Sequence, residues 1–485
     1  PDLEALTRRY AELRAAYDEA ADTAARRNVL ERWEALRRDL ETWSSWVGLR
    51  FQQDTRDPER KAAREARDEM APKLTELEVE LMKHIMAGPH AEEIGARFGR
   101  HLLDLWTCKA ASYEPKIEEE SVAESKTSAA YTELVSSARF DFRGETLNLS
   151  QLGKYAQDAD RDTRYVAARL RWGWFEEHAE ELDRLYGELV RVRCRQAEKL
   201  GYPSCVELAY TKRGRTDYDR SDVARYRVAV REHVVPLAAR LRERQREALG
   251  VDRLMAWDLP VQDPQGSPKP AGDHDWMLVR ARAMFDAMGD DLGGFFALMA
   301  DGGFLDLKAR EGKAGGGFCT SFPRYGMPFI FANFNGTKHD VEVFTHEVGH
   351  AFQCWSSRDQ PSVDYVWPTL EAAEVHSMSL EFLTWPHMEK FFGDDAERFR
   401  RTHLTESLLF LAYGVAVDHF QHLVFDNPAA TPADRLGMWQ EMRRTYMPWE
   451  DWGDIRRPAE GGLWQGQGHI YGVPFYYIDY TLAQV

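Results

Sequence analysis

Cysteine is scarce in this sequence, and long hydrophobic runs are absent. Five cysteines occur in 485 residues, and no two of them form a CxxC pair. That content argues against the disulfide framework of a secreted protein and predicts a reducing, cytoplasmic location. The longest apolar run, from Leu408 to Val417, is shorter than the roughly 20 residues that a membrane-spanning helix requires. The sequence therefore predicts no membrane partner.

Positive charge is also in deficit. The 63 Lys and Arg residues are outnumbered by 80 Asp and Glu residues, which gives a net charge of −17. Because binding to phosphates requires a cationic surface, this balance excludes a general nucleic-acid or anionic-membrane binder. It leaves neutral or cationic partners, including peptides. With 44% hydrophobic and 29% charged residues, the chain otherwise has an ordinary globular composition.

The chain begins with Pro1 rather than Met, and it stops at Val485. Its first residues, PDLEALTRRYAELRAAYDEA, are charged throughout and lack the apolar centre of a secretory signal. We expect both ends to be cloning or processing boundaries.

The patterning predicts a mainly helical fold with one small β-sheet. Helical spacing of apolar residues runs through residues 1–90 and again from Asp160 to Gly250, and a short hairpin is predicted around Arg143–Gly144. A loop rich in Pro, Gly and Asp extends from Asp258 to Trp276. The best strand candidate is Pro328–Phe334, and a helix follows it at once. We expect the small sheet to lie beside that helix.

That helix carries the sequence HEVGH, with Asp340 at its predicted N-cap. Residues four apart lie on one face of a helix, so His346 and His350 can bind one Zn²⁺. Glu347 is offset by one position and can serve as the general base of a metallopeptidase. Accidental HExxH matches are expected on the order of 0.05 times in a chain of this composition. The sequence therefore predicts a catalytic zinc site.

A catalytic zinc site needs a third protein ligand. Glu371, Glu374 and Glu381 fall on one face of a helix predicted between residues 368 and 382. Carboxylates on an otherwise apolar helix need a cation or a metal as partner. Glu374 is the predicted ligand and Glu371 the competing choice, while Glu381 can accept the second ring N–H of a ligand histidine. His376 lies on another face and is expected to be structural.

A glycine-rich tail ends the chain, in which glycines surround Trp464 and His469 and a group of tyrosines follows. Flexible backbone beside hydroxyl and imidazole donors is typical of a loop that closes over a substrate. Such donors can stabilise the oxyanion of peptide hydrolysis. The competing interpretation is an aromatic core helix, because tyrosine is often buried with its hydroxyl paired.

The motifs THEVGHAFQ and EVHSMSLEF together resemble the M3 family of metallopeptidases, the thimet oligopeptidase and oligoendopeptidase F group, which includes the Pz-peptidases. The segments ERWEALRRDLETWSSWVGLRFQQDTRD, FRGETLNLSQLGKYAQDADRDTR and HIYGVPFYYIDYTLAQ are similar to the same family, so the resemblance covers most of the chain. It implies one Zn²⁺ per chain, held by His346, His350 and Glu374, with Glu347 as the general base.

The resemblance also implies roles for the tail. Members of the family bind the substrate and the transition state with a histidine and tyrosines in this region, and His469 matches the histidine. Tyr476 and Tyr480 share a helical face, so they are the preferred catalytic pair. Tyr471 and Tyr477 remain alternatives that would bind the substrate.

The implied fold class is mainly α with one small β-sheet, in a two-lobed zincin-type metallopeptidase that encloses a deep substrate channel. We expect an N-terminal helical lobe over residues 1–200 and a zinc-binding catalytic lobe over residues 201–485. Such a channel excludes folded proteins, so the implied activity is endopeptidase cleavage of short oligopeptides. Because members of the family usually continue past this tail, we expect the C-terminus to be truncated relative to them.

Two other functions stay open. A metallocarboxypeptidase would have a channel closed at one end and a cationic group for the substrate's terminal carboxylate. A catalytically inactive helical peptide-binding protein would contain no zinc. The oligomeric state is not fixed by the sequence.

Three local features have their own interpretations. The strand MPFIFANFN is expected to be a core strand, an edge that pairs with a substrate backbone, or both. The loop GKAGGGFCTSF is expected to border the cleft as a flexible segment, and Cys354 to be a small buried apolar residue.

Overall fold

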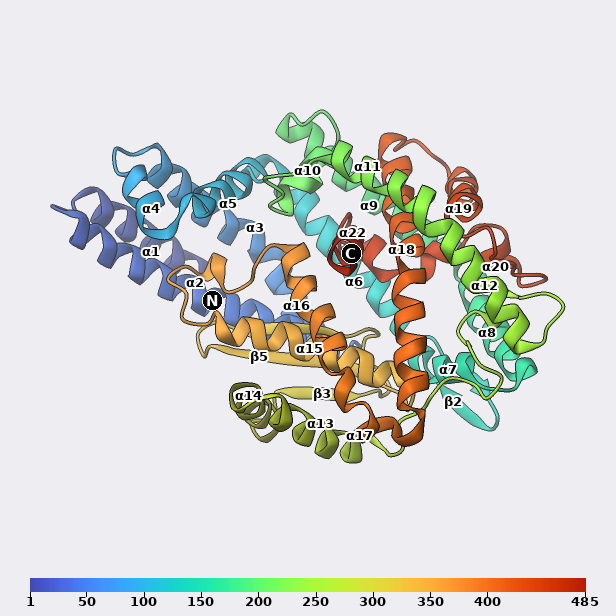
Figure 1. The fold of residues 1–485 in the computed structure, drawn as a ribbon. Helices are drawn as coiled ribbons and strands as arrows, with labels where there is room; N and C mark the ends of the chain where they lie inside the picture. The colour runs from blue at the N-terminus through green and yellow to red at the C-terminus, as the bar shows by residue number, and fades with distance from the viewer.

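Helices dominate the structure, a computed structural model that describes residues 1–485 (Figure 1). Two small sheets accompany them, a hairpin of β1 and β2 and a three-stranded sheet with the strand order β3-β5-β4. The helices enclose the C-terminal end of the chain, which lies near the centre of the view (Figure 1). The mainly helical fold predicted from the sequence is confirmed.

The first five helices form an elongated arm, and the sixth, α6, lies near the centre of the view beside the C-terminal end of the chain (Figure 1). Asp2, Asp22 and Asp57 begin the first three of them, because their carboxylates accept hydrogen bonds from backbone N–H groups of the first turn. The six helices are α1 (Leu3–Asp18), α2 (Thr23–Gln53), α3 (Pro58–Ala87), α4 (Ala91–Phe98), α5 (Arg100–Ala111) and α6 (Glu118–Ser136).

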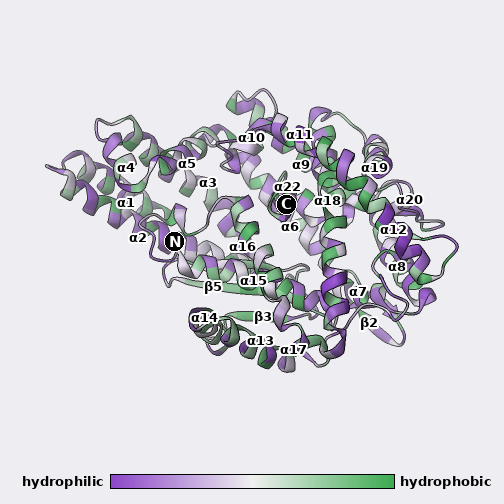
Figure 2. Cartoon of the chain, in the orientation of Figure 1, coloured by the Kyte–Doolittle hydropathy of each residue, from purple (hydrophilic) through white to green (hydrophobic).

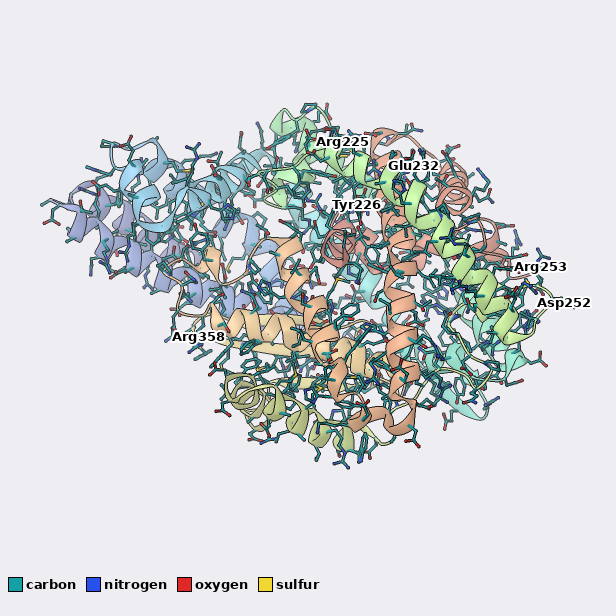
Figure 3. All side chains as sticks on the ribbon, in the orientation of Figure 1. Arg225, Tyr226, Glu232, Asp252, Arg253 and Arg358 are labelled. Carbon is teal, nitrogen blue, oxygen red and sulfur yellow. The ribbon has the colours of Figure 1, made fainter.

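The predicted hairpin is present, formed by β1 (Phe140–Phe142) and β2 (Glu145–Leu147). Its turn places Arg143 and Gly144 at φ 53° and 83°, the left-handed pair that a tight two-residue hairpin turn requires. Six helices follow it: α7 (Leu149–Gly153), α8 (Arg161–Glu177), α9 (Ala179–Leu200), α10 (Cys205–Lys212), α11 (Arg220–Ala229) and α12 (Val235–Leu249). The charged side chains of Arg225, Glu232 and Asp252 lie along this outer edge of the molecule (Figure 3).

The three-stranded sheet lies directly before the key helix. The segment between residues 259 and 273 is irregular, as predicted, and α13 (His274–Met288) and α14 (Asp290–Asp301) follow it. The strands are β3 (Leu305–Lys308), β4 (Phe318–Phe322) and β5 (Met327–Phe334). β5 pairs in parallel with β3 and antiparallel with β4.

This sheet corrects two predictions. β5, the strand MPFIFANF, is the central strand, so β3 and β4 occupy both of its edges and it has none left for a substrate backbone. The free edges of the sheet belong to its neighbours. The segment predicted as a flexible loop is in part strand, because Phe318 to Phe322 form β4, and only residues 312–317 before it remain irregular.

The remaining helices form the catalytic region and the tail: α15 (Lys338–Ser356), α16 (Leu370–Leu383), α17 (Glu389–Phe392), α18 (Ala396–Asp426), α19 (Pro432–Tyr446), α20 (Arg456–Ala459), α21 (Gly468–Gly472) and α22 (Tyr477–Gln484). The apolar run predicted to be too short for a membrane span is part of a longer helical stretch, Glu389–Asp426, which has the length and hydropathy of a span. Within the fold, 72% of its apolar window is buried, so its composition matches a core helix.

Three large hydrophobic clusters stabilise these regions. One lies within the N-terminal arm, one joins the three-stranded sheet to α13–α15 and the start of α18, and the largest surrounds the middle of α18 and the tail. β5 and the central turns of α18 are coloured as hydrophobic, whereas α12 presents a largely hydrophilic surface (Figure 2). The largest cluster contains residues from both sides of residue 200, so the division into lobes at that point stays a prediction.

Candidate metal centre and catalytic site

The helix α15 carries the HEVGH sequence on the face toward α16. It begins at Lys338 with Thr337 as N-cap, so the predicted N-cap, Asp340, lies inside the first turn instead. The Asp340 carboxylate accepts hydrogen bonds from the backbone N–H groups of Asn335 (3.0 Å) and Gly336 (2.7 Å), which joins the end of β5 to the helix. Burial raises the pKa of Asp340 to about 6.

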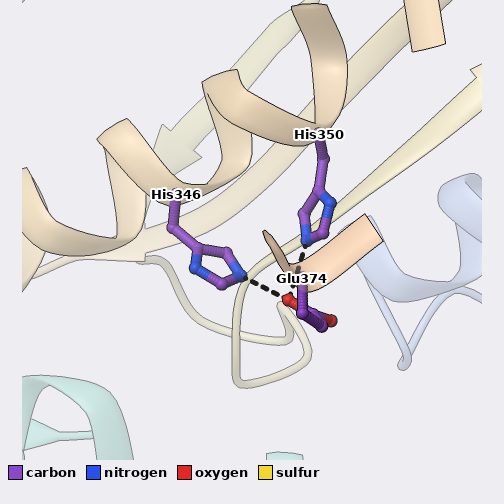
Figure 4. A group of neighbouring side chains, drawn as sticks. All are labelled: His346, His350 and Glu374. Carbon is purple, nitrogen blue, oxygen red and sulfur yellow. Dashed lines mark ion pairs between the residues drawn. The ribbon is translucent and has the colours of Figure 1, made fainter. Parts of the chain in front are cut away.

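His346, His350 and Glu374 converge on one point, as Figure 4 shows. The Nε2 atom of His346 lies 3.2 Å, and that of His350 3.3 Å, from the same oxygen of Glu374. Glu374 is fully buried. Burial alone would raise its pKa, but the two neighbouring imidazoles hold the pKa well below its usual range.

Gly349 allows the two helices to approach closely enough for this contact. A Cβ atom at that position would lie 2.6 Å from the Cα atom of Ser377 and 2.8 Å from the carbonyl oxygen of His376, both on α16. Any larger residue would therefore push α16 away from α15. The hydroxyl of Ser377 also donates to Glu374 Oε2 at 3.0 Å and fixes the carboxylate.

A second layer of contacts orients His346. Its Nδ1 atom lies 2.7 Å from Glu381 Oε1, and the other carboxylate oxygen of Glu381 lies 2.7 Å from His403 Nε2. Trp385 donates its indole N–H to His403 Nδ1 at 2.9 Å, so the proton of His403 is on Nε2 and points at Glu381. Sequence reasoning missed His403 and Trp385, because neither belongs to a motif and α18 brings His403 to the site from a distant part of the chain.

Glu347 is buried beside this group and has a free acceptor. Its Oε2 atom has no hydrogen-bond partner, and Nδ1 of His350 has none either. Burial raises the pKa of Glu347, and the adjacent histidines partly counteract this rise. A Cβ atom on Gly317 would lie 3.4 Å from Glu347 Oε1, so the glycine run before β4 packs directly against the carboxylate. His346, His350 and Glu374 are a candidate metal-ligand group, here called the metal-ligand group, and an unpaired buried carboxylate beside such a group is suited to accept a proton.

The tail brings His469, Tyr476 and Tyr480 to the same site. The hydroxyl of Tyr476 donates to Glu374 Oε1, and that of Tyr480 lies 3.2 Å from His469 Nε2. The ring of Tyr480 stands 6.3 Å from that of His346. Burial lowers the pKa of His469 to about 4, and Nε2 of Gln467 contacts its Nδ1 atom at 2.7 Å.

The other predicted residues lie farther from the metal-ligand group or in other surroundings. Tyr471 is fully buried, donates to the carbonyl of Leu182 at 3.2 Å and stacks on Tyr131. The Tyr477 ring contacts that of His469 at 4.9 Å between centroids. Glu371 is not part of the converging group, and the exposed His376 bonds to the carbonyl oxygen of Ala372 on its own helix. Cys354 is buried in a small apolar cluster, as predicted.

Basic residues from distant parts of the chain fix the tail. Arg193 of α9 donates to the carbonyls of Ile470 (3.3 Å) and Tyr471 (2.5 Å). Arg215 donates to the carbonyl of Phe475 at 2.6 Å and forms a buried ion pair with Asp479 at 3.0 Å. Neither arginine belongs to a recognisable sequence motif, so only the fold shows that they hold the tail.

A cavity of about 720 Å³ lies beside the site. His469, Val343 and the glycines Gly317 and Gly468 contribute to its lining, together with residues of α6, α7 and α8. A Cβ atom on Gly468 would lie 3.7 Å from the Tyr131 ring. Small residues along the tail therefore keep space open next to the metal-ligand group.

Similar proteins define the class. The chain matches the model of the Peptidase M3 N-terminal domain over residues 1–113 and that of Peptidase family M3 over residues 269–484. A crystal structure described as an oligoendopeptidase F is 43% identical, with a TM-score of 0.98 over 100% of this chain and 86% of that one. PZ peptidase A, solved with an inhibitor, is 41% identical, with a TM-score of 0.98 and the same coverage.

A third structure, described as an oligoendopeptidase F from Bacillus anthracis, is 39% identical, with a TM-score of 0.93 over 100% of this chain and 85% of that one. A search of curated proteins found no match. The fold is thus that of a helical metallopeptidase. The chain belongs to peptidase family M3 and is similar to the oligoendopeptidases within it.

Proposed function

We propose that this protein is a zinc-dependent endopeptidase that hydrolyses internal bonds of short oligopeptides. The observation that carries the proposal is the convergence of His346, His350 and Glu374, with the unpaired carboxylate of Glu347 beside them. Family membership supports the peptidase class, and peptidases of this family depend on zinc.

The donor set fits one zinc ion. Two imidazole nitrogens and a carboxylate oxygen lie within 4.8 Å of one another, and this is a ligand set of catalytic zinc sites that leave a fourth position open. Glu381 accepts the other ring N–H of His346 and would fix the tautomer that a ligand needs. When bound, the ion would polarise the attacking water and the scissile carbonyl.

The protein's own groups would move the protons. Glu347 takes a proton from the attacking water at its free Oε2 atom and then delivers it to the leaving amine. Its raised pKa is suited to both steps, because a weakly acidic carboxyl can also act as the acid.

Tyr476, Tyr480 and His469 would stabilise the negative charge that develops on the carbonyl oxygen. Hydroxyl donors held in a desolvated site are effective for this purpose. His469 is neutral above about pH 5, because burial lowers its pKa to about 4, so it would act as a hydrogen-bonding partner of Tyr480 rather than as a cation. Tyr477 and Tyr471 would contribute to the substrate-binding wall.

Mutation of the base tests the proposal. Glu347→Gln should lower kcat by about 10³-fold or more while one zinc per chain remains bound, because the amide keeps the shape but cannot accept a proton. The measurements are metal analysis and cleavage of an internally blocked oligopeptide followed by mass spectrometry. Normal turnover by the variant would contradict the mechanism.

The same blocked peptide separates the alternatives. An endopeptidase cuts it internally, whereas a metallocarboxypeptidase leaves it intact. A protein purified without chelators that contains no zinc and cleaves nothing would be an inactive peptide-binding protein. The cytoplasmic location and the division into lobes at residue 200 stay predictions, and so does the exclusion of nucleic-acid and membrane partners.

A further inference from the structure

Arg171 of α8 is a cation without an anionic partner on the wall of the cavity. Its guanidinium lies over the rings of Trp172 and Phe175, at 5.6 and 5.8 Å from their centroids, and no carboxylate or hydrogen-bond acceptor of the chain pairs with it. Burial lowers the pKa of Arg171, and only the hydroxyls of Tyr131 and Tyr413 act against that effect. Arg171 is only partly buried, so its unpaired guanidinium can face the cavity, where an anionic ligand would offset the cost of leaving the charge unpaired.

The other charged groups on the cavity wall have partners. Lys313 is held by Asp306 Oδ1 at 2.9 Å and by the carbonyls of Asp306 and Lys308 at 2.9 and 3.0 Å. Asp340 is occupied by the backbone N–H groups that precede α15. Arg171 is therefore the cation whose donors remain free to meet a ligand, although the chain as a whole carries a net charge of −17.

Arg171 also belongs to the same wall as the catalytic tail. A Cβ atom on Gly466 would lie 3.7 Å from its Nη2 atom, and His469 lies three positions farther along the chain. From there, Gln467 contacts His469, and His469 contacts Tyr480 beside the metal-ligand group. A peptide in this cavity would thus reach both the metal-ligand group and the guanidinium.

We propose that Arg171 binds a carboxylate of the peptide substrate and selects peptides that carry one at a fixed distance from the scissile bond. The inference rests on the proposed peptidase function and adds a substrate preference to it. Two sources share this chemistry, the free C-terminus of the peptide and an Asp or Glu side chain. A guanidinium that is held by aromatic rings and has open donors is suited to a planar carboxylate.

Four matched peptides distinguish the sources. They share one neutral sequence and differ only in a free or amidated C-terminus and in Glu or Gln near that end. The measured quantity is kcat/KM for each peptide, with the wild type, Arg171→Gln and Arg171→Lys. Arg169→Gln is the control, because Arg169 is an exposed arginine on the same helix that does not line the cavity. Thermal melting of each variant checks that it is folded.

We expect the wild type to prefer a carboxylate-bearing peptide over its neutral partner by about 10- to 100-fold in kcat/KM, mostly through KM, as is typical of a charge-assisted contact. Arg171→Gln should abolish that ratio, Arg171→Lys should keep part of it, and Arg169→Gln should keep all of it. If Arg171→Gln loses the preference for a free over an amidated C-terminus, Arg171 binds the terminal carboxylate. If it loses the preference for Glu over Gln, Arg171 binds the acidic side chain.

Two results would overturn the inference. One is a wild-type enzyme that cleaves all four peptides at similar rates, and the other is a preference that survives in Arg171→Gln. In both cases the wild type still cleaves peptides, so the proposed function stands. Failure of the zinc-loaded wild type to cleave any peptide is the separate result that contradicts the proposed function itself.

Discussion

The metal-ligand group and the tail meet at one site, but different forces hold them. His346, His350 and Glu374 are fixed by the contact of two adjacent helices, α15 and α16, which Gly349 allows to approach closely. The tail, residues 461–484, packs into the largest hydrophobic cluster and is also fixed by side chains from distant parts of the chain, among them Arg193 and Arg215. The metal-ligand group therefore depends on the packing of two neighbouring helices, and the tail on apolar and polar contacts with distant parts of the chain.

This difference predicts two kinds of failure. Loss of a metal ligand should remove the zinc and with it all activity, because the fitted donors act together. Loss of a tail hydroxyl should leave the zinc in place and slow the reaction, because a donor to the oxyanion stabilises only the transition state. Substitutions in the two regions can therefore be compared by zinc content and kcat measured on the same sample.

The largest effect is expected from Glu374→Gln. A neutral amide on the fully buried ligand position should reduce the zinc content from one per chain to near zero and abolish peptide cleavage. The control is Glu371→Gln on the same helix, which should keep both zinc and activity, because Glu371 lies outside the converging group. If Glu371→Gln loses zinc and Glu374→Gln keeps it, Glu371 is the zinc ligand and Glu374 is not.

A smaller effect is expected from Tyr480→Phe. Its hydroxyl lies beside His469 and its ring beside His346, so removing the oxygen should lower kcat by about 10²- to 10³-fold with little change in zinc content or KM. Tyr477→Phe is the matched control, and it should lower kcat by much less. Equal losses in the two variants would mean that the tyrosines act through packing and not through one oxyanion donor.

Glu381→Gln should act on the metal-ligand group more gently than ligand removal. The carboxylate orients His346 and is itself oriented by His403, so its loss should weaken zinc binding by about 10- to 100-fold. Competition with a chelator of known affinity measures this change. His376→Gln, on the exposed side of α16, should leave the affinity unaltered.

The sequence could predict that His346, His350 and Glu374 lie together because the signals are local, and their role as metal ligands stays a prediction. An i, i+4 histidine pair and a carboxylate stripe on the next helix are both visible in the helical period. The fixing of Glu381 by His403 was not predictable, because the sequence does not show which turn of α18 faces α16. The central position of β5 was also missed, since the identity of the neighbouring strands is decided by long-range pairing.

The chemical character of the tail could be predicted from its composition, but the side chains that hold the tail in place could not. Glycines and tyrosines predicted a loop that closes over a substrate, yet a guanidinium that holds backbone carbonyls leaves no pattern in the sequence. Arg171, Arg193 and Arg215 all read as ordinary surface arginines in helical segments. Only their positions in the fold show that two of them hold the tail and that the third has no partner.

The last prediction concerns stability rather than catalysis, at Glu124 of α6, which lies behind the tail. It accepts from Arg193 Nε at 2.7 Å and from Gln196 at 2.9 Å. Burial alone would raise its pKa, but Arg193 and Lys212 lower it to about 2. Because the pKa is lower in the folded state than the value of about 4.3 in an unfolded chain, this carboxylate stabilises the fold above about pH 5, and the stabilisation is lost as pH falls toward 2.

The full contribution is about 3 kcal/mol, of which about 2 kcal/mol should be lost by pH 3. Urea unfolding at pH 6 and pH 3 measures it, as the difference in unfolding free energy between the wild type and Glu124→Gln. That difference should shrink by about 2 kcal/mol at the lower pH, whereas Glu119→Gln, an exposed position on the same helix, should show no such change. If the difference in unfolding free energy between the wild type and Glu124→Gln does not change with pH, the ionised Glu124 does not stabilise the fold. Arg193 would then hold the tail without help from Glu124.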